Sequence, residues 1–279
     1  MKPETVCTVV FSPTGTSRKI AEAVARGIAS GAGAEALKTI DLTHAAAQSA
    51  VLPAGAVAVI AAPVYGGHVA PTAAKRLETL RGSGTPAVVI AVYGNRAFEK
   101  AAAELAALAA RQGFVPVAAA AFVGEHSYST PETPVAAGRP DAQDLARAAE
   151  FGAAVREKLA AGTPAPVDAA KLKDVHTPLV PMLRFIRFVV GYRRRQKKNP
   201  VVYLPACDAD RCTHCGRCTA VCPTQAIARG DEVHTDPARC IRCCACVKGC
   251  PVGARSFHTP FAAALARSFT RRKPPVTLL

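Results

Sequence analysis

The chain has 279 residues, of which half are apolar and a fifth are charged. This balance is typical of globular proteins, excludes disordered and collagen-like chains, and leaves room for two domains. The net charge of +15 is uneven, because residues 1–160 carry 15 basic against 13 acidic side chains, whereas residues 161–279 carry 20 against 7. Without an 18-residue apolar run or a signal-peptide pattern, we expect a cytoplasmic protein.

The N-terminal segment predicts a strand, a hydroxyl-rich loop and a helix in succession. Residues 5–11 are apolar and β-branched, and Ile20, Val24 and Ile28 fall on one face of a helix over 18–29. A helix start presents unpaired N–H groups and a partial positive charge, which is typical of a phosphate site. The loop between them contains Ser12, Pro13, Thr14, Gly15, Thr16 and Ser17. It resembles the FMN phosphate loop of flavodoxins, and ordinary helix capping is the alternative interpretation.

The rest of the N-terminal half alternates between predicted strands and helices. The strands cover 35–41, 57–62, 87–92 and 117–123, and the helices cover about 71–80, 98–112 and 141–160. This alternation predicts an α/β fold with a parallel sheet covered on both faces. The resemblance to flavodoxins implies a doubly wound five-stranded sheet in the order 2-1-3-4-5, with ligands at the strand-end loops.

Three strand-end loops supply further candidate flavin contacts. They are Pro63, Val64, Tyr65, Gly66 and Gly67; Tyr93, Gly94, Asn95 and Arg96; and Gly124, Glu125 and His126. Glycines allow the backbone to approach a flat ring, and Tyr65 and Tyr93 are candidates to stack on it, although each is equally explained as a half-buried loop residue. His126 and Tyr128 are candidate proton donors, or His126 stabilises its loop by a hydrogen bond. Because the chain has no Trp, the Trp that stacks on the flavin in some flavodoxins is absent, and loss of FMN binding is a further alternative.

Residues 162–205 are predicted to form a linker, because the first part is rich in Pro, Ala and Lys. From Arg184 to Lys198, seven of 15 residues are basic. Three interpretations remain open: a solvated charged segment whose apolar residues pack on a neighbouring domain, a docking site for an acidic redox protein, or a peripheral contact with an anionic membrane. No motif favours nucleic-acid binding.

Ten of the 11 cysteines lie between Cys207 and Cys250. Eight of them form two runs of C-x-x-C-x-x-C-x-x-x-C-P that repeat after 28 residues: Cys212, Cys215, Cys218 and Cys222, then Cys240, Cys243, Cys246 and Cys250. In a cytosolic protein this clustering indicates metal ligation rather than disulfides.

The spacing predicts two 4Fe–4S clusters. In this pattern the fourth cysteine of each run binds the other cluster. We therefore assign Cys212, Cys215, Cys218 and Cys250 to one cluster, and Cys240, Cys243, Cys246 and Cys222 to the second. Zinc is the alternative, but its sites usually combine C-x-x-C pairs or Cys with His. Cys7 is interpreted as a core residue. Cys244 is interpreted as a bystander, with an alternative cluster ligand as the other interpretation, and the role of Cys207 is open.

Residues 206–256 resemble bacterial ferredoxins with two 4Fe–4S clusters, which implies two short hairpins and two short helices. As a whole, the chain resembles flavodoxin–ferredoxin fusion proteins. The resemblance implies a flavodoxin-like FMN-binding domain at 1–161, a linker at 162–205, a ferredoxin domain at 206–258 and a basic tail at 259–279. The leading hypothesis is an electron carrier that passes electrons between the clusters and FMN. The alternatives are a flavin-dependent reductase of a small acceptor and a regulatory module with an empty flavodoxin-like domain.

Overall fold

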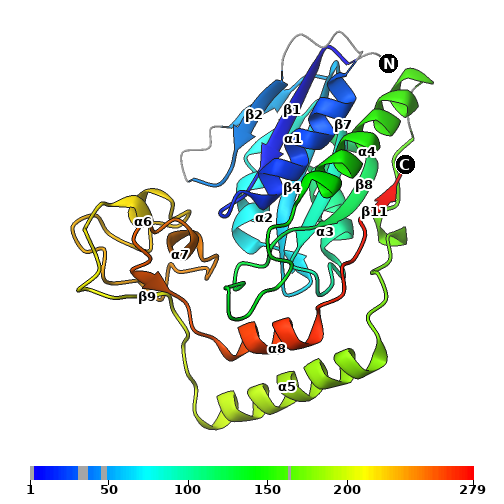
Figure 1. Ribbon diagram of the computed structural model, residues 1–279. Coiled ribbons are helices and arrows are strands. Elements are labelled where there is room, and N and C mark those ends of the chain that lie inside the picture. Colours follow the sequence, from blue (N-terminus) through cyan, green and yellow to red (C-terminus); the bar gives the residue numbers. More distant parts are fainter. Residues whose placement is uncertain (1–2, 31–36, 45–48, 163–164) are drawn as a thin grey trace. The chain divides into compact units, whose positions relative to one another are not determined.

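The computed structural model describes residues 3–30, 37–44, 49–162 and 165–279 (Figure 1). They form two compact units. The first unit comprises Met1–Glu125, Gly138–Val175 and Arg272–Leu279, and the second comprises His126–Ala137 and His176–Arg271. The units are therefore interleaved in the sequence, and their boundaries differ from the predicted domains 1–161, 162–205, 206–258 and 259–279.

The first unit is built on a sheet whose five long parallel strands have the order β2-β1-β4-β7-β8. The strands are β1 (Thr5–Val10), β2 (Leu37–Asp41), β4 (Ala56–Tyr65), β7 (Thr85–Tyr93) and β8 (Phe114–Val123). Counted along the chain, this is the order 2-1-3-4-5, so the predicted flavodoxin-like fold is confirmed. Of the second predicted strand, residues 35 and 36 lie outside the described residues.

Short strands complete the first unit. β5 (His68–Val69) turns back on β4, and β3 (Ala50–Leu52) pairs with β6 (Leu80–Gly82). β11 (Val276–Leu278) adds antiparallel to β8. The predicted basic tail is therefore not one separate segment, because its last residues form main-chain hydrogen bonds with the sheet.

Four helices flank the sheet: α1 (Thr16–Ala29), α2 (Pro71–Leu77), α3 (Ala101–Arg111) and α4 (Ala142–Ala160) (Figure 1). α1 and α4 pack closely, because a Cβ atom at Gly27 would lie 2.0 Å from the carbonyl oxygen of Ala149, and one at Gly152 would lie 2.1 Å from that of Val24. These contacts bury the apolar faces of both helices together with the β-branched residues of the strands.

A buried ion pair ties the C-terminal segment to α4. Arg139 donates to both carboxylate oxygens of Asp144, at 2.8 and 2.5 Å, and to the carbonyl of Lys273. Arg272 pairs with Asp141, which also caps the N-terminus of α4 by accepting from Asp144 N.

In the second unit, α5 (Leu179–Lys198) and α8 (Pro260–Ser268) pack through aromatic rings. The ring centroids of Phe185 and Phe269 are 5.0 Å apart, as are those of Phe188 and Phe261. The Pro-, Ala- and Lys-rich part of the predicted linker was expected to be loose, but its last residues, from Leu179, are helical. The basic segment that follows continues the same helix, and its aromatic residues pack on the region of α8, in line with the interpretation that its apolar residues pack on neighbouring structure. Among the described residues, no helix is long and apolar enough to cross a membrane.

The cysteine-rich part of the second unit contains two one-turn helices, α6 (Arg217–Ala220) and α7 (Ala245–Lys248), and a two-stranded sheet of β9 (Ala206–Cys207) and β10 (Arg255–Ser256). Of the two expected hairpins, the second is reduced to a single bridge between Ala228 and Asp231. The sequence duplication is preserved in the backbone. Left-handed conformations recur 28 residues apart in three pairs: His214 and Arg242, Gly216 and Cys244, and Gln225 and Gly253.

Candidate functional site

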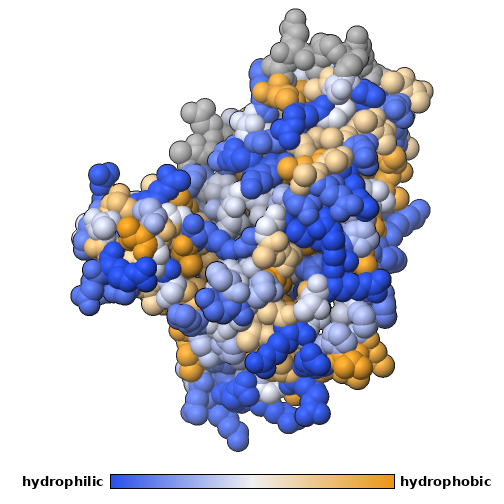
Figure 2. All heavy atoms as spheres, viewed as in Figure 1, coloured by the Kyte–Doolittle hydropathy of each residue, from blue (hydrophilic) through white to orange (hydrophobic). Residues whose placement is uncertain are grey.

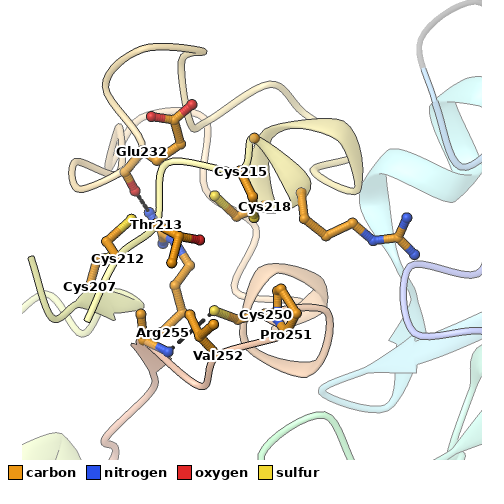
Figure 3. Close-up of a pocket in the computed structure, with 13 residues that line it drawn as sticks. Cys207, Cys212, Thr213, Cys215, Cys218, Glu232, Cys250, Pro251, Val252 and Arg255 are labelled. Atoms are coloured by element: carbon orange, nitrogen blue, oxygen red, sulfur yellow. Dashed lines mark hydrogen bonds between the residues drawn. The ribbon is translucent and has the colours of Figure 1, made fainter.

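The first of two cysteine-lined cavities is shown in Figure 3. Its volume, with the space open to solvent, is about 300 Å³, and its lining includes Cys212, Cys215, Cys218 and Cys250. The structure thus brings together three cysteines of the first run and the last cysteine of the second run. Cys207, on β9, lies on the same cavity beside Cys212.

A second cavity, also of about 300 Å³ with its space open to solvent, is lined by Cys222, Cys240, Cys243 and Cys246, and Cys244 lines it beside them. These are the last cysteine of the first run and three cysteines of the second run. No group of three or more His, Cys, Asp or Glu side chains among the described residues could hold a single metal ion. The eight thiols are instead spread around two cavities, each with four of them.

Backbone donors support the two remote cysteines in the same way. Ala226 N donates to Cys222 Sγ at 3.2 Å, and Ala254 N donates to Cys250 Sγ at 3.2 Å. Burial acts to raise the pKa of Cys250, but backbone N–H groups, with that of Arg255 first, outweigh it and hold the pKa below its usual value. N–H···S bonds of this kind orient thiolate ligands and raise the reduction potential of the cluster they hold.

Arg255 is a buried cation in contact with both cavities. Its side chain lines the first cavity, and its Nη1 lies 3.9 Å from Cys246 Sγ in the second. It is only 4% exposed, and its guanidinium bonds to neutral acceptors, including Thr235 Oγ1 and the carbonyl of Glu232. Its Nε is buried without a hydrogen-bond partner. Since an uncompensated buried cation is unfavourable, this environment fits the negative charge of an iron–sulfur cluster.

Sequence reasoning missed Arg255. The signal was present in the duplication, because the residue 28 positions earlier is the buried Ile227. The second repeat therefore has a cation where the first repeat has an aliphatic core residue. This cation contacts both cysteine-lined cavities.

The additional cysteines also have defined places. Cys7 is buried in β1, where burial raises the pKa of its thiol to about 11. Cys244 is 1% exposed and has φ 59° at the start of α7. It occupies the position that Gly216 holds at the start of α6, so in the ligand loop it adopts the left-handed conformation that turns the backbone.

The segment His126–Ala137 belongs to the second unit, although it directly continues the strand-end residues Gly124 and Glu125 of β8. Lys248 Nζ, on α7, donates to the carbonyl of Ser129 at 3.0 Å. Tyr128 packs on Phe257, and burial raises the pKa of its phenol to about 12, with a further contribution from Cys244. This segment therefore packs against the loop that supplies three cysteines of the second cavity.

His126 has a structural role within that segment. Its Nδ1 accepts a hydrogen bond from Tyr128 N at 3.0 Å, and its ring lies against the Tyr128 ring at 4.8 Å. Of the two interpretations made from the sequence, the loop-stabilising hydrogen bond is present.

In the first unit, the hydroxyl-rich loop leads from β1 into α1. Gly15 has φ 83°, which favours glycine, and no side chain caps the helix at this position. Ser17 Oγ is fully buried and has no hydrogen-bond partner, whereas Ser12 Oγ accepts from Arg18 N at 3.1 Å. Part of the loop thus serves helix capping, while the helix start and the Ser17 hydroxyl fit an anionic group.

The end of β8 approaches this loop closely. A Cβ atom at Gly124 would lie 2.9 Å from Thr16 Cβ, so only glycine allows this contact. Glu125 accepts a hydrogen bond from Gly138 N at 2.9 Å and is thereby held in its own turn.

The other two strand-end loops differ from the prediction in detail. β4 continues through Pro63, Val64 and Tyr65 before Gly66 and Gly67 turn the chain, with φ 62° and 92°. The half-buried Tyr65 therefore lies at the end of a strand that turns back as a hairpin.

Tyr93 is 3% exposed and packs edge-on against Phe98 with ring centroids 5.5 Å apart. Because its side chain is buried beside Phe98, it offers no open face for stacking. After Gly94, Asn95 is buried with φ 63°, and Arg96 pairs with Glu99.

Residues 204–257 match the family model of the 4Fe-4S dicluster domain. The C-terminal part of the chain therefore contains an iron–sulfur domain, and the first unit has the strand order of a flavodoxin-like fold. No curated protein sequence matches the chain.

Solved structures similar to the first unit share little sequence with it. A flavodoxin from the domain Archaea is 16% identical, with a TM-score of 0.34 over 56% of this chain and 99% of its own. The Flv1 flavodiiron core from Synechocystis sp. PCC6803 is 16% identical, with a TM-score of 0.36 over 57% of this chain and 37% of its own. Megasphaera elsdenii flavodoxin is 14% identical, with a TM-score of 0.33 over 54% of this chain and 99% of its own.

Proposed function

We propose that this protein transfers electrons between two 4Fe–4S clusters in its second unit and an FMN at the strand-end edge of its first unit. The observation that carries the proposal is the pair of cavities, each of which has in its lining four of the eight repeat cysteines, drawn from both runs. Four thiolates are the usual ligand set of a 4Fe–4S cluster. When bound, the clusters exchange single electrons, and FMN supplies one- or two-electron chemistry.

The two cavities support the ligand sets that the cysteine spacing predicts. Cys212, Cys215, Cys218 and Cys250 hold one cluster, and Cys222, Cys240, Cys243 and Cys246 hold the other. The N–H groups of Ala226 and Ala254 orient the two remote thiolates. The chain surrounds the clusters with short loops and keeps several ligands buried, which limits the access of water and oxidants.

The hydroxyl-rich loop holds the FMN phosphate. Ser17 Oγ, the hydroxyls of Thr14 and Thr16, and the N–H groups at the start of α1 donate to it. Support comes from the buried Ser17 hydroxyl without a partner and from the close approach of Gly124 to Thr16.

Cofactor content of the anaerobically purified full chain tests the proposal. We expect about eight irons and eight sulfides per chain, as two 4Fe–4S clusters require, together with one FMN. Rapid addition of a low-potential reductant should bleach the cluster absorbance and then the flavin absorbance. Stoichiometric zinc without iron would contradict the cluster assignment, and loss of flavin with intact clusters would favour the empty flavodoxin-like alternative.

The phosphate site is tested by removing the hydroxyls of two half-buried loop residues. Replacing both Thr14 and Thr16 by Val should weaken FMN binding at least ~100-fold. Each hydrogen bond to a charged group contributes about 1.5–3 kcal/mol, and a tenfold change in affinity corresponds to ~1.4 kcal/mol. A matched control replaces Thr79 and Thr277, two exposed threonines, by Val. Equal binding of FMN and riboflavin to the unmodified protein would show that the loop is only a helix start.

A further inference from the structure

The helix α5 has two apolar faces, and only one of them is packed. Phe185, Phe188 and Tyr192 contact rings of α8, with Tyr192 and Phe261 centroids 4.8 Å apart. On the opposite side, Leu179, Leu183, Ile186 and Val190 are 43–68% exposed. Their spacing of four, three and four residues aligns them in one stripe about 17 Å long.

All charged side chains of α5 are positive. Its 20 residues include seven Arg or Lys and no Asp or Glu. All seven basic side chains are exposed, and most lie in the last third of the helix. In Figure 2 the α5 surface shows hydrophobic residues at its N-terminal end and hydrophilic residues along the rest.

We propose that α5 binds an anionic lipid surface, with the stripe Leu179–Val190 in the acyl boundary and the basic residues against the headgroups. An exposed aliphatic stripe next to a Lys/Arg cluster on one helix is the pattern of interfacial helices. A second copy of this chain is a poor occupant, because its own seven positive charges would face these. The helix lies on the membrane rather than across it, since its charges exclude a span. This inference does not depend on the proposed electron transfer.

The aliphatic stripe distinguishes a lipid surface from an acidic redox protein. Charge alone would suit both partners. Exposed Leu, Ile and Val gain free energy only where they leave water, and protein interfaces are instead anchored chiefly by Trp, Tyr and Arg. The packed face of α5 holds its aromatic side chains, and the open face holds aliphatic ones.

Flotation of the anaerobically purified full chain with vesicles tests the proposal. We expect binding to phosphatidylcholine vesicles that contain phosphatidylglycerol, weak binding to phosphatidylcholine alone, and release at high salt. Replacing Arg193, Arg194 and Arg195 by Gln should weaken binding about a hundredfold, because each basic residue near the surface is worth roughly fivefold.

The stripe is tested separately from the charge. Replacing Leu183 and Ile186 by Ser should weaken binding at least tenfold, while the matched replacement of the exposed Leu37 and Val51 by Ser should not. Because the chain has no Trp, an Ile186→Trp variant carries a single reporter, whose emission should shift to shorter wavelength on vesicles. Unchanged emission, unchanged binding of the Leu183/Ile186 variant, or capture of an acidic redox protein without flotation would overturn the proposal.

Discussion

Replacing Arg255 by Gln should lower the reduction potential of both clusters. The guanidinium is 4% exposed, lines the first cavity and lies 3.9 Å from the thiol of Cys246 in the second. Reduction adds one negative charge to a cluster, and a nearby buried cation favours that charge. Glutamine keeps much of the size and hydrogen bonding but removes the cation.

The magnitude follows from the distance. Two unit charges 4 Å apart interact by about 4 kcal/mol at an effective dielectric constant of 20. The added electron spreads over the cluster, so its mean distance from Arg255 is about twice that value and the interaction is about 2 kcal/mol. For a one-electron couple, a tenfold change in the equilibrium constant corresponds to about 59 mV and to ~1.4 kcal/mol. Loss of an interaction of about 2 kcal/mol should therefore lower the reduction potential by about 80 mV.

The assay is an anaerobic redox titration followed by electron paramagnetic resonance, which resolves the cluster signals without requiring turnover. Arg255→Lys should retain most of the potential because it keeps the charge. Arg229→Gln removes an equal charge from an exposed position of the same unit and should change the potential little, because solvent screens it. Equal potentials in Arg255→Gln and Arg229→Gln, with iron content intact, would refute the reasoning.

Three further predictions concern ligation, the backbone and pH. Cys222→Ala should remove the same signal as Cys243→Ala, and loss of the other signal would show that the remote cysteines are not exchanged between the runs. Cys244→Gly should retain both clusters, because glycine suits φ 59° at that position; loss of iron would make Cys244 a ligand. Asp141→Asn keeps the helix cap but removes the pair with Arg272, whose hydrogen bond holds the pKa of Asp141 below its usual range. This stabilisation of the folded state is present above the ordinary Asp pKa near 4 and is lost as the pH falls through the lower folded-state pKa. Urea unfolding should therefore show a lower free energy of unfolding for Asp141→Asn at pH 7 and equal free energies for the two proteins in strong acid. A difference that does not depend on pH would contradict this.

The strands and the cysteine loops could be predicted because their formation depends on residues that are close together in the chain. β-branched apolar runs specify strands buried on both faces, so β1, β4, β7 and β8 appear close to their predicted positions. The cysteine spacing specifies how a short loop presents three thiols. Even the remote cysteine of each run follows from this spacing, since both cavities gather the predicted sets.

The strand-end loops were predicted less well. The Tyr-Gly steps suggested two open rings, but Tyr93 is covered by Phe98. Whether a ring at a strand end is open depends on what packs beside it, and that neighbour follows only from the tertiary fold.

The sequence alone determined the strands, the phosphate-type loop and the duplicated ligand runs, because each depends on residues close together in the chain. Only the tertiary structure decided that β11 joins the sheet beside β8, that α5 packs on α8, and that His126–Ala137 belongs to the second unit. It also decided that Arg255 is buried between two sets of thiols. These features join residues tens to more than a hundred positions apart, and their stability comes from apolar burial and from charges removed from water, which no local pattern encodes.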